Sequence, residues 1–117
     1  MITVEEILLL QVGRHFQLSE DWHLVVGRRE EENQRLLDLL REGDTLLRVQ
    51  GIPGPLGLLR GPAGEEDLQL AASIVARYSK AKNQEKVEVQ YGKNGDDFRG
   101  RLLVSPARDE QIPALRY

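Results

Sequence analysis

Residues 22–43, WHLVVGRREEENQRLLDLLREG, change from a strand pattern to a helix pattern and thereby set the fold class. The segment 22–26 consists of strand-forming residues and stops at Gly27. Acids then fill a first helical turn, where the helix dipole favours negative charge, and Gly43 closes the helix. One apolar stripe with an amide at its start follows the helical period, through Asn33, Leu36, Leu37 and Leu40. A strand therefore leads directly into an amphipathic helix.

The flanking segments add further strands and one more helix. The patterns predict a bent strand over 8–18, strands over 44–49, 56–60, 87–91 and 98–104, and a helix over 65–81. The order β-β-α-β-β-α-β-β predicts an α+β fold with two β-β-α-β-like halves. We expect a mixed or mostly antiparallel sheet with both helices packed on one face. We also expect a single domain over residues 1–105 and a frayed C-terminal tail over 106–117.

The composition is that of a folded, soluble protein. The chain has 117 residues, of which 40% are hydrophobic and 30% are charged, and this suits one domain with one core. Its apolar runs fall far below the ~20 residues that span a bilayer, and its start lacks the pattern of a signal peptide. Cysteine is absent, which excludes disulfides and thiolate metal sites. We therefore expect no membrane association and a cytoplasmic location.

No catalytic constellation is recognisable. His15 and His23 fall on neighbouring strands, but too few further ligands accompany them for a metal site. The serines have no nucleophile elbow, and no glycine stretch matches a phosphate-binding loop. The acids Glu30 to Glu32 are explained by a solvated helix start. We expect no catalytic residue, no metal and no cofactor, and therefore a domain that is not itself an enzyme.

The segment 77–101 is basic within an acidic chain. The net charge of the whole chain is −3, so nucleic acid could be bound only locally. This segment holds seven basic and four acidic residues, and Tyr78, Tyr91 and Phe98 are interleaved with them and could stack on bases. The alternative is a helix end and a hairpin with ordinary surface charges, and composition alone favours that alternative.

Several short motifs, taken together, resemble a known family. They are Gly27-Arg28, Asn33 and Leu36, Asp44, Ile52-Pro53-Gly54, Ala71-Ala72, Tyr78-Ser79-Lys80-Ala81-Lys82 and Val87 to Tyr91. Their order and spacing resemble the RNA-binding domain of the NFACT proteins, tRNA-handling factors of ribosome-associated quality control, over roughly residues 22–105. The stretch Val12 to Phe16 is more similar to a variant found as a C-terminal module of 2-thiouridylase-like PP-loop proteins.

The sequence departs from the family pattern in two loops. Leu46 and Arg48 stand where the family has tryptophan and histidine after the aspartate, and Pro55-Leu56 replaces Ser-His after Pro53-Gly54. Arg29 stands where the family often has asparagine. Any contact or chemistry that those family side chains provide is therefore not transferred to this chain.

The resemblance implies an accessory domain that binds RNA, above all tRNA, in tRNA thiolation or ribosome quality control. Its partner enzyme would be a PP-loop ATPase domain in the same or another chain, so that the parent protein could be a tRNA-thiolation enzyme. The residues that we expect to contact RNA are Arg28, Arg48, Arg77, Tyr78, Lys80 and Lys82. Of these, Arg48 replaces a family histidine and keeps a positive charge, and Arg77 belongs to the basic segment 77–101. The implied structural motif is Gly27, Asn33, Asp44, Pro53 and Gly54, in which Asn33 would be a buried amide that binds neighbouring backbone.

A second hypothesis is a protein–protein docking domain that positions a partner enzyme. The net negative charge and the apolar tail residues Ile112, Leu115 and Tyr117 favour it. Both hypotheses predict a binding module without its own catalytic set.

Overall fold

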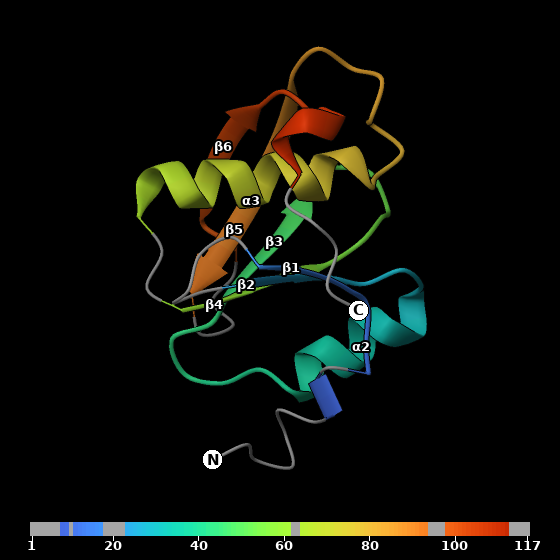
Figure 1. Cartoon of the computed structure of the whole chain (residues 1–117), viewed down its shortest axis with the longest axis vertical. Helices are drawn as coiled ribbons and strands as arrows, with labels where there is room; N and C mark the ends of the chain where they lie inside the picture. The colour runs from blue at the N-terminus through green and yellow to red at the C-terminus, as the bar shows by residue number, and fades with distance from the viewer. Residues whose placement is uncertain (1–7, 10, 18–22, 62–63, 94–97, 113–117) are drawn as a thin grey trace.

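Six strands form one antiparallel sheet in the computed structural model, which describes residues 8–9, 11–17, 23–61, 64–93 and 98–112 (Figure 1). The sheet order is β1-β2-β4-β3-β5-β6, and every neighbouring pair is antiparallel. The strands are β1 (Arg14–Gln17), β2 (His23–Val26), β3 (Thr45–Val49), β4 (Gly57–Arg60), β5 (Val87–Lys93) and β6 (Gly100–Val104). The helices are α2 (Glu30–Asp38), α3 (Glu65–Arg77) and the 3-10 turn η1 (Asp109–Gln111). The predicted α+β class and the antiparallel sheet are confirmed.

The two helices cover opposite faces of the sheet, so the prediction that both pack on one face is wrong (Figure 1). Val25 of β2 packs in one core with Leu36 of α2, whereas its neighbours Leu24 and Val26 pack in the other core with α3. The same division holds on β3 and β4, where Leu46 and Leu58 lie on the α2 side and Leu47 and Leu59 on the α3 side. Successive strand residues point to opposite faces, and here both faces are apolar, so each needs its own cover.

The N-terminal strand is shorter than predicted. Leu8 and Leu9 are helical, a turn follows, and β1 begins only at Arg14. Gly13 in this turn has a φ of 73°, and a Cβ there would lie 2.6 Å from the carbonyl oxygen of Val26. The spacing of the apolar residues before Gly13 is therefore that of a turn packed on the α2-side core, and not a strand alternation.

Both helices end earlier than predicted. In α2 the last residue is Asp38, and Leu37, which was predicted in the apolar stripe, is 42% exposed. Gly43 is not the helix cap; it has a φ of 91° and lies in a later turn, while Leu39 is the C-cap of α2. The helix α3 ends at Arg77, and the residues up to 81 form the turn that follows it.

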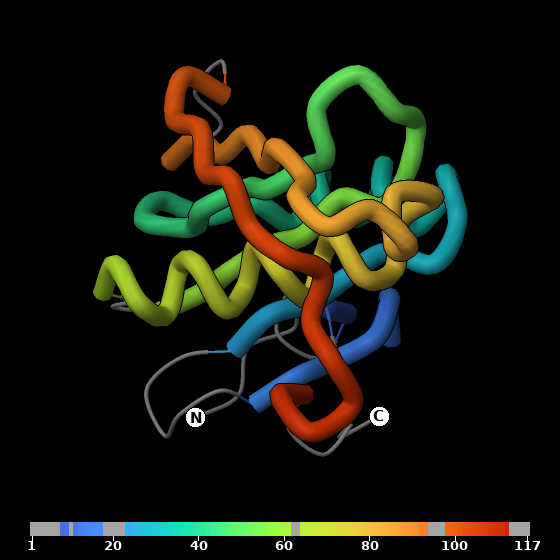
Figure 2. The backbone as a smooth tube through the Cα atoms, turned by 90° about the horizontal axis from the view of Figure 1, so that it is seen from above, coloured from blue at the N-terminus to red at the C-terminus, as the bar shows by residue number. Residues whose placement is uncertain are grey.

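The segment after β6 packs on the fold, contrary to the expectation of a frayed tail. Figure 2 shows it crossing α3. The amide of Ala107 donates to the carbonyl oxygen of Ser73 at 2.9 Å, and Ala107 is buried. Ile112 packs against the α3-side core. The domain boundary at residue 105 stays a prediction, and residues 113–117 lie outside the described part of the chain.

Candidate functional site

A cleft of about 430 Å³ lies where four segments far apart in the sequence meet. Its walls come from the start of β1, the β2–α2 turn with the N-terminus of α2, the loop 53–55, and the turn 78–82 after α3. Arg28, Tyr78, Lys80 and Lys82, four of the six RNA contacts proposed from the sequence, line this one cleft. Folding therefore brings together Arg28 and Lys82, which lie 54 residues apart in the chain (82 − 28).

Asn33 fixes the loop wall of the cleft. Its side-chain carbonyl accepts a hydrogen bond from the amide of Leu56 at 3.0 Å, and its amide group donates to the carbonyl oxygen of Gly54 at 3.3 Å. A Cβ at Gly27 would lie 2.1 Å from the Asn33 carbonyl oxygen, so only glycine fits beside this amide. The side chain of Asn33 thus connects α2 to the loop 53–55 through backbone hydrogen bonds, and Gly27 leaves the space that this side chain needs.

The turn after α3 forms the basic wall. The hydroxyl of Ser79 donates to the carbonyl oxygen of Ala76 at 2.6 Å and accepts from the amide of Ala81 at 3.1 Å. Ala81 is fully buried, whereas Lys80 and Lys82 on either side of it are exposed. The lysines therefore extend from a fixed turn and not, as predicted, from the last turn of the helix.

The charge of the cleft is mostly positive. Its lining has five cationic side chains and one carboxylate, that of Glu30, although the chain as a whole carries a net charge of −3. Two of the cations, Arg28 and Arg29, form ion pairs with acids of α2. The other three, Arg14, Lys80 and Lys82, make no ion pair with any residue that the structure describes.

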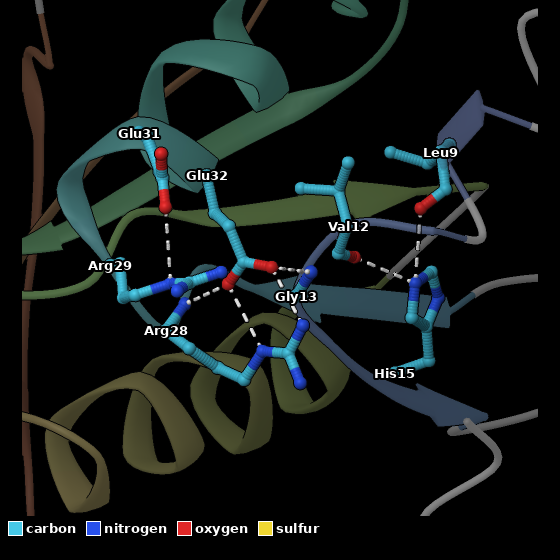
Figure 3. A network of polar contacts seen from close by, with 8 residues as sticks. All are labelled: Leu9, Val12, Gly13, His15, Arg28, Arg29, Glu31 and Glu32. Atoms are coloured by element: carbon cyan, nitrogen blue, oxygen red, sulfur yellow. Dashed lines mark hydrogen bonds and ion pairs between the residues drawn. The ribbon is translucent and has the colours of Figure 1, made fainter.

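Glu32 binds Arg28 and the turn before β1 in a single network (Figure 3). Its buried carboxylate accepts hydrogen bonds from the amide of Gly13 at 3.1 Å and from the amide of Arg28 at 2.9 Å. It also accepts from the guanidinium of Arg28, Nε at 3.0 Å and Nη2 at 2.7 Å. These bonds, above all those from the Arg28 side chain, lower the pKa of Glu32 to about 2. The positive charge of Arg28 is therefore largely offset by its neighbour.

Arg14 and Tyr78 form a cation–π contact in the lining of the cleft. The guanidinium carbon of Arg14 lies 5.0 Å from the centre of the Tyr78 ring, a cation–π geometry. The ring of Phe16, in the α3-side core, lies 5.8 Å from that of Tyr78. Arg14 was not among the RNA contacts predicted from the sequence. Its position two residues before the core residue Phe16 was the available signal, because residues i and i+2 of a strand share a face.

Arg48 and Arg77, the other two predicted RNA contacts, lie outside the cleft. Arg48 donates from Nε to Gln90 at 3.0 Å and lies 3.9 Å over the ring of Phe98. Arg77 forms an ion pair with Asp109 and donates to the carbonyl oxygen of Ala107 at 3.1 Å. Both side chains therefore contribute to internal contacts of the fold.

Asp44 also lies away from the cleft. Its carboxylate accepts two hydrogen bonds from Arg60, at 2.9 and 2.7 Å, and one from the amide of Arg41 at 2.8 Å. Asp44 is buried, and this paired geometry is structural. Pro53 and Gly54, by contrast, line the cleft itself.

The two histidines form a stacked pair, with ring centres 6.0 Å apart. Burial lowers the pKa of both His15 and His23.

The structure offers no group of three or more histidines, cysteines or acids for a metal ion within the residues it describes. No helix in the described ranges is long and apolar enough to cross a bilayer.

Comparison with known proteins shows one family and one fold. The family model for the NFACT protein RNA binding domain matches residues 13–116. A solved structure, the C-terminal part of the fibronectin/fibrinogen-binding protein from Streptococcus suis, superposes with a TM-score of 0.73 at 20% sequence identity. The alignment covers 88% of this chain but only 49% of that one, so the chain spans about half the length of this neighbour. No curated protein matches the chain.

Proposed function

The chain belongs to the NFACT protein RNA binding domain family, and we propose that it binds RNA in the cleft between α2 and the turn after α3. The single observation that carries the proposal is the meeting of Arg14, Lys80 and Lys82, three cations without an ion pair among the described residues, in one cleft. Lysine and arginine are the side chains that bind RNA phosphates, and they do so most strongly when no carboxylate competes.

The cations of the cleft differ in what they offer to RNA. Lys80 and Lys82 are exposed point charges for phosphates, and Arg14 offers a planar guanidinium. Arg28 contributes less, because Glu32 already accepts two of its donors. Arg48 and Arg77 lie outside the cleft and are not part of this proposed interface.

The RNA that we propose is tRNA, held for an enzyme whose catalytic groups lie in another domain or chain. The similarity of the stretch Val12 to Phe16 to the thiouridylase-associated variant supports a PP-loop ATPase domain as that partner. In this scheme the domain acts in the cytoplasm in tRNA thiolation, or alternatively in ribosome quality control. Sequencing of the RNA that co-purifies with the chain tests this finer step, since a population without enrichment of tRNA contradicts it.

Binding itself is tested by fluorescence anisotropy with labelled tRNA at low salt. Lys80→Glu reverses an unpaired charge in the cleft and is expected to weaken binding by about tenfold or more. Arg101→Glu is the matched control, because Arg101 is 61% exposed on β6 and does not line the cleft. Its affinity is expected to stay within about twofold of the unaltered chain. Equal losses for both variants contradict the site, and no binding at low salt contradicts the function.

A docking role remains a second candidate because of one exposed apolar side chain. Leu103 on β6 is 67% exposed and lies beside Arg101 on that strand. The tail gives less support than its sequence indicated: Ile112 packs against the core, and Leu115 and Tyr117 lie outside the described residues. Capture of a PP-loop enzyme by RNase-treated chain, lost in Leu103→Asp but kept in Lys80→Glu, would favour docking over RNA binding.

A further inference from the structure

The Arg14–Tyr78 stack is held in place by the core. The ring of Tyr78 packs against Phe16 and the α3-side core, and Tyr78 is the C-cap residue of α3. Arg14 is the first residue of β1, so its backbone is fixed by pairing with Val26. The Tyr78 ring and the pairing of β1 therefore restrict the orientation of the Arg14 guanidinium in the free protein. This restriction reduces the conformational entropy that Arg14 loses when a ligand binds.

The guanidinium of Arg14 is accessible to a ligand in the cleft. It lies over the Tyr78 ring, yet Arg14 is only partly buried and lines the cleft. No carboxylate of the described residues pairs with it. A guanidinium plane that is neither paired nor covered on both faces is a surface on which a nucleobase stacks.

The phosphate-binding groups lie in the same cleft as this plane. Lys80 and Lys82 extend from the turn that begins directly after Tyr78, and both are exposed. A flat surface and two ammonium groups in one cleft match the two parts of a nucleotide, its base and its phosphates.

The groups that line the cleft favour an unpaired strand. The loop wall lies near the basic wall, since a Cβ added at Gly54 would come within 3.6 Å of the Cβ of Ser79, an ordinary van der Waals contact. The bases of an A-form duplex are stacked on one another inside the helix and are not presented to such a surface, whereas unpaired bases can turn outward.

From this geometry we infer that the cleft binds an unpaired nucleotide of RNA, with its base stacked on Arg14 and its phosphates on Lys80 and Lys82. The inference rests on the proposed function and adds the class of RNA to it. Arg14 determines the preference for unpaired RNA, because its guanidinium is the planar group among the three cations of the cleft that form no ion pair with the described residues.

The first experiment needs no variant. Anisotropy titrations compare a labelled single-stranded RNA with an oligonucleotide of equal length in which abasic spacers replace the internal nucleosides, so that the number of phosphates is unchanged. The abasic strand is expected to bind about tenfold more weakly. A blunt-ended duplex of the same sequence is also expected to bind more weakly than the single strand.

Two matched variants separate the base from the phosphates. Arg14→Lys keeps the charge and removes the plane, so the difference between the normal and the abasic strand is expected to disappear while the salt dependence stays. Lys80→Ala is expected to keep that difference and to lower the slope of log affinity against log salt by about 0.7. Thermal unfolding of each variant verifies that the fold is retained.

The outcomes separate the inference from the proposed function. Equal binding of normal and abasic strands, or a preference for the duplex, overturns the inference and leaves RNA binding intact. Discrimination that survives in a folded Arg14→Lys variant overturns the role of Arg14. Absence of binding to every RNA at low salt overturns the proposed function itself.

Discussion

At the scale of single residues, Glu32 shows how one carboxylate can support both the fold and the site. It is buried, and it binds the turn at Gly13, the backbone of Arg28 and the guanidinium of Arg28 at once. In the sequence it is the last of three acids at a helix start, and nothing in that run distinguishes it from Glu31, whose side chain is 70% exposed.

Glu32 is expected to make the stability of the fold depend on acid pH. Its pKa is about 2 in the folded chain, below the usual value of 4.5, so its ionised form stabilises the folded state fully above about pH 4.5. That contribution is lost as the pH falls from 4.5 through 2. Glu32→Gln should lower the free energy of unfolding at pH 7 by roughly 2 kcal/mol, less than the full shift implies because Arg28 is half exposed. Urea unfolding at several pH values measures both effects.

The matched control for this prediction is Glu31→Gln. It removes an exposed carboxylate on the same turn of α2, whose ion pair with Arg29 is at the surface. Its stability should stay close to that of the unaltered chain at every pH. The free energy of unfolding of Glu32→Gln is compared with that of the unaltered chain at pH 2 and at pH 7. If the difference is the same at both pH values, the role assigned to the carboxylate is contradicted.

At the scale of elements, the approach of α3 to the sheet depends on small residues. The helix presents Ala71, Ala72 and Ala76, all fully buried, and the sheet presents Gly57 of β4 opposite Val75. A Cβ at Gly57 would lie 2.6 Å from Cγ2 of Val75 and 3.4 Å from Cδ1 of Leu24. Glycine at this position therefore sets the distance between the two layers.

Gly57→Ala is expected to destabilise the chain because α3 and β4 must move apart. Overpacking of this kind typically costs about 1–3 kcal/mol, which chemical denaturation would detect as a lower midpoint. Gly54→Ala is the matched control: its Cβ would meet Ser79 at 3.6 Å, an ordinary contact. If the two variants have the same stability, α3 does not depend on Gly57 for its close approach.

At the scale of the whole molecule, an acidic chain carries one local basic cleft. Repulsion from the net charge of −3 acts on RNA everywhere, so binding needs the three unpaired cations to act together. Each phosphate contact contributes about −0.7 to the slope of log affinity against log salt for a single strand.

The double variant Lys80→Ala/Lys82→Ala is therefore expected to reduce the steepness of that slope by about 1.4. Anisotropy titrations between low and moderate salt give the slope directly. Arg108→Ala serves as the control, because Arg108 pairs with Glu110 and does not line the cleft. A double variant with an unchanged slope would show that the lysines do not contact phosphates.

The local elements were largely readable from the sequence. Strand and helix periods placed β2, β3, β4 and β5 within a few residues, since those patterns depend on neighbours along the chain. The sequence of these strands also indicated that both faces of the sheet are covered. Leu24 and Val25 are consecutive apolar residues, as are Leu46 and Leu47, and consecutive residues of a strand point to opposite faces. The start of β1 could not be read from local patterns, because the turn before it is held by the hydrogen bond from the amide of Gly13 to Glu32, 19 residues later in the chain.

For the candidate site, the sequence by itself determined the residue types: a basic turn at 78–82 and a helix entry at 27–33, both within the family match. Only the tertiary structure decided which cations share a cleft and which are paired. It brought in Arg14 from β1, offset Arg28 with Glu32, and placed Arg48 and Arg77 elsewhere. The reason is physical: the charge that a side chain offers depends on its neighbours in space, and strand pairing and helix packing set those neighbours over long sequence distances.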